Sequence, residues 1–163
     1  MNAADGFVDL QVNGYADVDF NCDELSTERV TAVCQRLRAD GLAGILATVI
    51  TADVDAMCRR LSIICRICES DSAIAGMICG IHIEGPFLNE RPGYIGAHPA
   101  EFARPADIDT MKRLLDAGGG HMKIVTLAPE QDDQGRVTKL LTELKTARID
   151  FAGIWRDYAT LAR

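Results

Sequence analysis

The chain has 163 residues, of which 48% are hydrophobic and 25% are charged, and its formal net charge is −7. This composition is typical of one globular domain with a single core and argues against disorder. The negative charge argues against a nucleic-acid partner, which would require a basic surface to neutralise phosphates. No apolar run approaches the roughly 20 residues that span a bilayer, and Met1 to Gly6 do not resemble a signal peptide, so we expect a soluble cytoplasmic protein.

Apolar runs typical of strands alternate with amphipathic segments typical of helices. Strands are predicted at Phe7 to Val12, Leu42 to Ile50, Ala73 to Ile83, His121 to Leu127 and, more briefly, Asp150 to Trp155. Helices are predicted from the Ser26 cap to Asp40-Gly41, from Asp53 to Glu69, from Pro105 as a first helical residue to Gly118-Gly119-Gly120, and from Val137 to Leu144. The segment from Asn13-Gly14 through Asp23 is predicted to be a polar loop.

The predicted strands are almost continuously apolar, which indicates a parallel sheet covered on both faces. Two α/β architectures fit this pattern: part of a TIM barrel, or an open doubly wound sheet. The open sheet would place a glycine-rich phosphate loop after the first strand, where the chain has only Asn13-Gly14. We therefore predict a partial TIM barrel of about four to five β/α units, because a complete barrel needs roughly 200 residues or more.

Three of the six cysteines fall on one predicted helix. Cys58, Cys65 and Cys68 recur at nearly helical spacing with other apolar residues, so they are expected to pack as small hydrophobic side chains. The pair Cys65 and Cys68 has a C-x-x-C spacing, but no second pair or nearby histidine completes a zinc set. Reduced thiols fit a cytosolic protein best.

The stretch from Gly80 to Asn89 places a carboxylate at a strand end. An apolar run stops at Glu84, and Gly85-Pro86 follows at once. In parallel α/β proteins the carboxyl ends of strands and the loops after them carry ligands and catalytic groups. Taken alone, however, Glu84 fits a solvated surface carboxylate equally well, because such residues are common.

Polar residues also end the other predicted strands, and they are expected to converge on one mouth of the sheet. They are Gln11 and Asn13 at the end of the first strand, Thr48 and Thr51 at the end of the second, His82 and Glu84 at the end of the third, and Thr126 and Glu130 at the end of the fourth. Such a set suits a polar or metal-binding site. For each residue alone, an ordinary turn or strand position is the simpler explanation.

Four sequence motifs, in this order, resemble the N-acetylglucosamine-6-phosphate deacetylases of the amidohydrolase superfamily. They are Phe7-Val8-Asp9-Leu10-Gln11-Val12-Asn13-Gly14, Gly80-Ile81-His82-Ile83-Glu84-Gly85-Pro86-Phe87-Leu88-Asn89, Gly96-Ala97-His98-Pro99 and Val125-Thr126-Leu127-Ala128-Pro129-Glu130. The resemblance covers roughly residues 6 to 138, and residues 139 to 163 do not resemble the continuation of the family. We expect a single incomplete barrel domain over residues 1–163.

The resemblance implies a role for each matching residue. Glu84 matches the carboxylate that binds the catalytic divalent metal, zinc or iron, and Gln11 matches an amide near that metal. His98 matches a histidine that contacts the substrate, and Ala97 and Asn13 are expected beside it in the substrate-binding set. His82 has the same strand parity as Glu84, so a supporting role is expected for it rather than ligation.

The reaction that the resemblance implies is hydrolysis of the N-acetyl group of N-acetylglucosamine 6-phosphate to glucosamine 6-phosphate and acetate. The family takes two histidine ligands, a further substrate histidine and a catalytic aspartate from strands that follow the fourth motif. The three histidines here, His82, His98 and His121, all precede that motif, and no motif supports Asp157 in the tail as the base. His121 is expected to be structural or exposed. We therefore expect a truncated chain with little or no activity alone.

Two functions remain open on the sequence. The first is a deacetylase represented by an incomplete chain that binds an amino-sugar phosphate. The second is a non-catalytic remnant that binds a sugar phosphate or a partner subunit. A partial barrel has unpaired edge strands, so we also expect a homo-oligomer or association through the open barrel edges.

Overall fold

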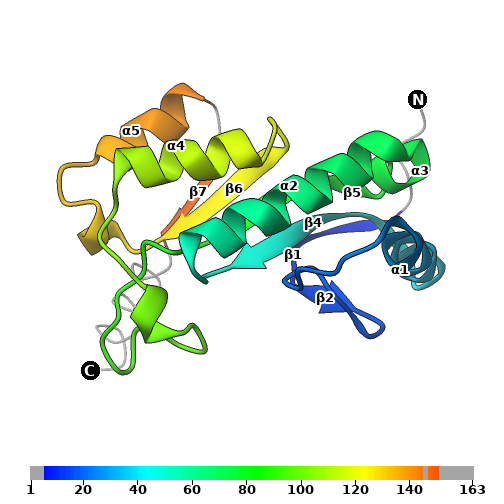
Figure 1. Cartoon of the computed structure of the whole chain (residues 1–163), viewed down its shortest axis with the longest axis horizontal. Helices are drawn as coiled ribbons and strands as arrows, with labels where there is room; N and C mark the ends of the chain where they lie inside the picture. The colour runs from blue at the N-terminus through cyan, green and yellow to red at the C-terminus, as the bar shows by residue number, and fades with distance from the viewer. Residues whose placement is uncertain (1–5, 145–146, 151–163) are drawn as a thin grey trace.

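The computed structural model describes residues 6–144 and the backbone of 147–150 (Figure 1). Its main sheet has five parallel strands in the order β1, β4, β5, β6, β7. Their bounds are Phe7–Val12, Leu42–Ile50, Ile78–Glu84, Met122–Leu127 and Ala147–Asp150. Spatial order follows chain order without the reversal that defines a doubly wound sheet. The predicted α/β fold, a partial barrel with a parallel sheet, is confirmed.

Helices pack along the sheet and connect its strands. They are α1 (Thr27–Ala39), α2 (Val54–Ser70), α3 (Ser72–Ala75), α4 (Ile108–Ala117) and α5 (Arg136–Glu143), with short 3₁₀ turns at Ala100–Phe102 and Pro129–Gln131. Figure 1 shows α2 and α4 side by side in front of the sheet. Each begins at an aspartate whose side chain accepts hydrogen bonds from backbone amides of the first turn, Asp53 for α2 and Asp107 for α4.

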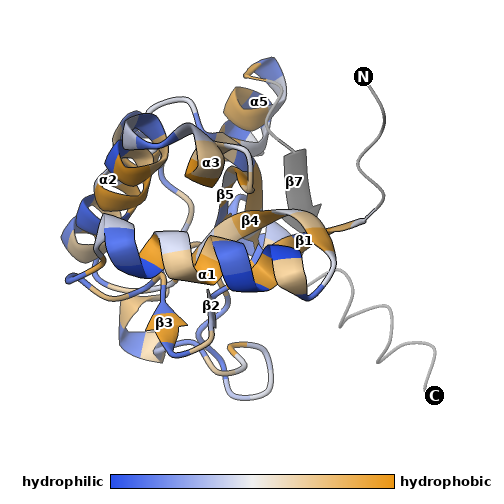
Figure 2. Cartoon of the chain, turned by 90° about the vertical axis from the view of Figure 1, so that its right-hand side faces the viewer, coloured by the Kyte–Doolittle hydropathy of each residue, from blue (hydrophilic) through white to orange (hydrophobic). Residues whose placement is uncertain are grey.

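The sheet has two chemically different faces, because alternate residues of a strand point in opposite directions. Ala47, Val49, Ile81, Ile83 and Val125 belong to the main hydrophobic core together with residues of the helices. Helix α1 carries both hydrophobic and hydrophilic residues along its length (Figure 2), and its buried residues are apolar. The residues in between are polar at the strand ends: Thr48, His82, Glu84 and Thr126, all of them buried. The polar set is therefore separated from the helix-covered core by the sheet itself.

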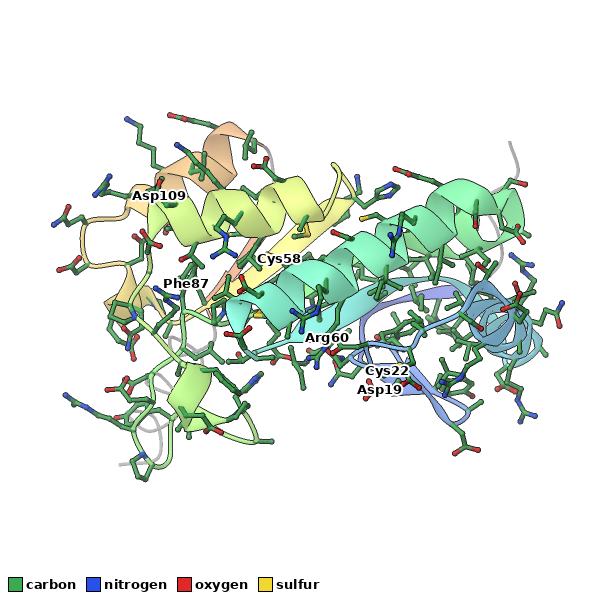
Figure 3. The ribbon with its side chains drawn as sticks, in the orientation of Figure 1. Asp19, Cys22, Cys58, Arg60, Phe87 and Asp109 are labelled. Atoms are coloured by element: carbon green, nitrogen blue, oxygen red, sulfur yellow. The ribbon has the colours of Figure 1, made fainter. Side chains whose placement is uncertain are left out.

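The segment after Asn13, predicted to be a loop, contains a small hairpin. Strands β2 (Gly14–Tyr15) and β3 (Val18–Asp19) pair antiparallel around Ala16 and Asp17, which have positive φ of 48° and 63°. Neither is the glycine that such a turn usually shows, so the sequence carried little signal for it. Beyond the hairpin, Arg60 of α2 extends toward the segment before α1 (Figure 3), where its Nε lies 3.1 Å from Asp23 Oδ1.

Two predicted boundaries are wrong and a third lies mainly outside the described residues. The third strand begins at Ile78 and not at Ala73, because Asp71 caps the short helix α3 by accepting from the amides of Ala73 and Ile74. Pro105 is not the first residue of α4, because Asp107 caps that helix. Of the predicted strand Asp150 to Trp155 only Asp150 is described, and it ends β7.

Candidate functional site

Glu84 ends β5 with a buried carboxylate that has a different neighbour at each oxygen. Its Oε2 accepts a hydrogen bond of 2.8 Å from Gln11 Nε2, and its Oε1 lies 3.4 Å from His98 Nε2. Only 5% of the residue is exposed. Glu84 is therefore not the solvated surface carboxylate that the sequence left open, since its oxygens face two other predicted site residues.

The backbone on both sides of Glu84 is held by the neighbouring strands. Thr51 Oγ1, just after β4, donates to the Glu84 carbonyl at 3.0 Å, and the Gly85 amide donates to the Thr126 carbonyl of β6 at 2.9 Å. Gly85 has φ of 87°, and a Cβ there would lie 2.0 Å from Thr51 Oγ1. Only glycine fits this position, so the residue after Glu84 is part of what fixes the carboxylate.

An irregularity in β1 brings Gln11 to the site. The pairing of β1 with β4 is in register at Asp9 and again at Val12, with a register shift between them. Within this interruption the Gln11 amide donates to Asp9 Oδ1 at 2.9 Å, while the Gln11 side chain reaches Glu84 across the intervening strand β4. Bulges of this kind re-aim side chains and occur often beside functional sites.

His82 lies two residues before Glu84 and makes a separate set of contacts. Its Nδ1 lies 3.0 Å from the Leu10 carbonyl oxygen and its Nε2 lies 2.8 Å from Thr126 Oγ1. The residue is 1% exposed, and burial lowers the pKa of its imidazole. Both ring nitrogens are thus directed at protein groups other than the Glu84 carboxylate, in line with the supporting role expected for His82.

The other predicted site residues lie in the loops and turns between the strands and helices. His98 has a side chain that is 9% exposed, while Ala97 beside it is exposed. Asn13 follows β1, and its carbonyl accepts from the Phe20 amide at 2.9 Å. Glu130 lies in the turn after β6 and accepts from Asn89 Nδ2 at 2.7 Å in an exposed pair. The structure therefore brings together Gln11, Glu84 and His98, whereas the contacts described for Glu130 and Asn13 are with Asn89 and Phe20.

The remaining histidine, His121, contacts a residue outside this cluster. His121 is one third exposed and its Nε2 lies 3.9 Å from Glu69 Oε1, as expected for a structural or exposed residue. Asp157 lies outside the described residues.

Asn21 supports the site in a way that the sequence did not indicate. Its Nδ2 donates to the Thr48 carbonyl and its Oδ1 accepts from the Ile50 amide, each at 2.9 Å. These bonds satisfy the end of β4 where β1 no longer pairs with it. An asparagine in a polar loop is common, so nothing in its neighbourhood in the sequence predicted this role.

The described residues do not form a complete metal site. A catalytic zinc site usually takes three protein ligands, from His, Cys, Asp or Glu. Within residues 6–144 no group of three or more such side chains is arranged to hold a metal ion. Glu84 and His98 supply one carboxylate and one imidazole, and the amide of Gln11 is a weak zinc ligand. The chemistry of this donor set falls short of what the metal requires.

Several curated proteins are similar to this chain in sequence. No protein-family profile matches the chain. N-acetylglucosamine-6-phosphate deacetylase of Bacillus subtilis is 32% identical over 140 residues, and that of Homo sapiens is 31% identical over 142 residues. Each alignment covers 85% of this chain and 34% of the relative. The chain thus spans about one third of the length of the curated relatives that it matches.

Solved structures agree with the sequence comparison. A Mycobacterium smegmatis deacetylase variant in complex with N-acetyl-D-glucosamine-6-phosphate superposes with a TM-score of 0.76 and 30% identity, over 89% of this chain and 36% of that one. The deacetylase of Thermotoga maritima, at 21% identity, shares the fold with a TM-score of 0.71. In sequence and in backbone fold, this chain matches about one third of an N-acetylglucosamine-6-phosphate deacetylase.

Proposed function

We propose that this chain forms one wall of the active site of a metal-dependent deacetylase that releases acetate from an N-acetylated amino-sugar 6-phosphate. The observation that carries the proposal is the buried Glu84 carboxylate at a strand end, with Gln11 and His98 at its two oxygens. The deacetylase names of the relatives support the reaction class. In the proposed site Glu84 is a metal ligand, and His98, Ala97 and Asn13 line the substrate side.

The chain alone is proposed to have little or no activity. Hydrolysis of an amide needs a group that takes a proton from water and returns one to the leaving amine. Glu84 does not supply this group, because it is the proposed metal ligand and its Oε2 already accepts from Gln11. The rest of the relatives' length, about two thirds, is then the source of the other groups, including the remaining ligands of the zinc or iron.

The sugar is proposed to be N-acetylglucosamine 6-phosphate. Most of the relatives carry that name, but N-acetylgalactosamine-6-phosphate deacetylase of Escherichia coli is also 27% identical over 126 residues. The two sugars differ at one hydroxyl, so a comparison of acetate release from both distinguishes them.

All six cysteines are free, which supports placing the protein in the cytoplasm.

Complementation tests the proposed function. The chain is produced alone and together with a second polypeptide that carries the part of the Mycobacterium smegmatis deacetylase outside the matched region. We expect acetate release from N-acetylglucosamine 6-phosphate by the pair, and none above background by either polypeptide alone. A copurified pair with no acetate release would contradict the proposal.

A non-catalytic remnant that binds a partner is the second candidate, and the exposed edge of the sheet favours it. Phe7, Val8 and Leu10 of β1 are 86%, 50% and 51% exposed, which is unusual for large apolar side chains on one strand. In this case the chain would bind its partner, and would bind the sugar phosphate by calorimetry, without any acetate being released under complementation.

A further inference from the structure

The carbonyl of Leu10 lies in the interrupted part of the pairing between β1 and β4. The register shift between Asp9 and Val12 removes Leu10 and Gln11 from the pairing of β1 with β4. The Leu10 oxygen instead lies 3.0 Å from Nδ1 of His82, on β5. A carbonyl oxygen can only accept a hydrogen bond, so the proton of this pair must be on Nδ1. This holds whether the imidazole is neutral or charged.

The second nitrogen of the ring is held from the opposite side. His82 Nε2 lies 2.8 Å from Thr126 Oγ1 on β6. With the proton on Nδ1, a neutral ring has Nε2 free to accept, and the Thr126 hydroxyl can donate to it. The ring thereby links β6 to β1. Strand β4 lies between β5 and β1, and its residue Thr48, the register partner of His82, is buried.

We propose that His82 is a positioning residue: fixed as the Nδ1–H tautomer, it clamps the Leu10 carbonyl and so directs the next side chain, Gln11, onto the Glu84 carboxylate. A glutamine at an exposed edge strand has several rotatable bonds and would otherwise sample many rotamers. The contact with His82 fixes the backbone next to Gln11, and Gln11 Nε2 can then donate to Glu84 Oε2 at 2.8 Å. The inference concerns the site on which the proposed function rests, but its test needs no catalysis, so the two can fail separately.

The tautomer is measured directly. Long-range proton–nitrogen NMR correlation on the chain, above neutral pH, distinguishes a ring protonated at Nδ1 from one protonated at Nε2. We expect the Nδ1–H pattern for His82. A ring that is protonated at Nε2 alone, or that exchanges between the two forms, would overturn the inference.

Two substitutions test whether His82 positions Gln11, and the measured quantity is the hydrogen-exchange rate of the Gln11 side-chain amide. In His82→Asn the new amide can donate to Leu10 in place of Nδ1, whereas His82→Leu removes the donor. We expect hydrogen exchange of the Gln11 side-chain amide to stay slow in the wild type and in His82→Asn. In His82→Leu it should accelerate about tenfold, the effect of losing one hydrogen bond, toward the rate of exposed Gln35.

The matched control is His121→Leu, which removes a partly exposed histidine outside the site. Gln11 should be unaffected in this variant. Equal exchange in His82→Asn and His82→Leu, or slow exchange in both, would show that the donor to Leu10 does not position Gln11. If His82→Leu does not fold, the tautomer decides the question, and fast exchange in His82→Asn would also overturn the inference.

Discussion

Two of the three thiols on α2, those of Cys65 and Cys68, are buried and stay protonated in the folded chain near neutral pH, whereas Cys58 is half-buried. Burial raises the pKa of Cys65 to about 11 and that of Cys68 to about 12, from an ordinary value of 9.0. A thiol with a raised pKa is inert toward metals and disulfide exchange near neutral pH. The burial of both thiols therefore explains why the C-x-x-C spacing between Cys65 and Cys68 does not indicate a redox or zinc motif.

These shifts predict a dependence of stability on pH at the alkaline end. The unfolded chain ionises its thiols near pH 9, but the folded chain does so only near pH 11 to 12. The stability from keeping these thiols neutral is therefore complete below pH 9 and is lost as the pH rises toward 12. The free energy of unfolding, measured by urea unfolding at a series of pH values, should fall less steeply with rising pH in the double variant Cys65→Ala, Cys68→Ala than in the wild type. Parallel profiles for the two proteins would contradict the prediction.

At the scale of the element, the start of α2 shows how one residue sets the geometry of a strand-to-helix connection. Asp53 Oδ1 accepts from the Asp55 amide at 3.1 Å and from the Ala56 amide at 3.2 Å. These amides have no partner within the helix, so the side chain satisfies them. The cap also fixes the loop between β4 and α2, which carries Thr51 to its bond with the Glu84 carbonyl.

Asp53→Ala should lower the free energy of unfolding by about 1 kcal/mol, because the first turn loses its acceptor. Asp53→Asn is the matched control, since asparagine caps a helix about as well and should cost only a few tenths of a kcal/mol. Both are measured by urea unfolding. A similar loss in the two variants would mean that the negative charge, and not the cap, is what matters at this position.

Local chemistry determined which elements the sequence could predict. β4 was predicted at its observed bounds, Leu42–Ile50, because a long run of β-branched and aliphatic residues lies between a glycine and a capping aspartate. The start of β5 was not, because Asp71 turns an apolar run into a short helix whose residue Ile74 still points into the core. An apolar run alone does not distinguish a buried strand from a buried turn of helix.

The candidate site was predictable only in part, for a related reason. Glu84 could be found because strand, carboxylate and Gly85-Pro86 are contiguous in the sequence. The contacts of His82 with Leu10 and Thr126 depend on a register shift in β1, and register is a property of paired strands. The role of Asn21 also depends on strand pairing, since it bonds the end of β4 beyond the last residue that pairs with β1. No single segment contains that information.

At the scale of the whole molecule, β1 presents an open edge. It is the first strand of the sheet order, and β4 is its only neighbour among the described residues of that sheet. Phe7, Val8 and Leu10 are exposed there, next to a surface hollow of about 460 Å³ that Gln11, Tyr15 and Leu42 help to line. Unpaired edges with apolar side chains favour pairing with another chain.

We predict that the chain alone self-associates through this edge. Sedimentation velocity should show species larger than a monomer of 17.7 kDa, increasing with concentration. Leu10→Lys should shift the population toward monomer, because a charge on an edge strand opposes pairing. The matched control is Leu144→Lys, a leucine of similar exposure, 53%, that follows α5. Equal behaviour of the two variants, or a wild type that is monomeric throughout, would count against edge pairing.

No described helix has both the length and the apolar character needed to cross a bilayer.

The metal content of the complemented pair tests most directly whether Glu84 belongs to a deacetylase site shared between the two polypeptides. The pair is purified, dialysed and analysed for zinc and iron, with the wild-type chain, with Glu84→Gln and with His121→Gln as the matched control. We predict about one metal ion per pair for the wild type and for His121→Gln. For Glu84→Gln we predict a loss of metal affinity at least as large as the roughly 10–100-fold cost of removing an outer-shell partner. Full metal content in Glu84→Gln would contradict the assignment of Glu84 as a ligand.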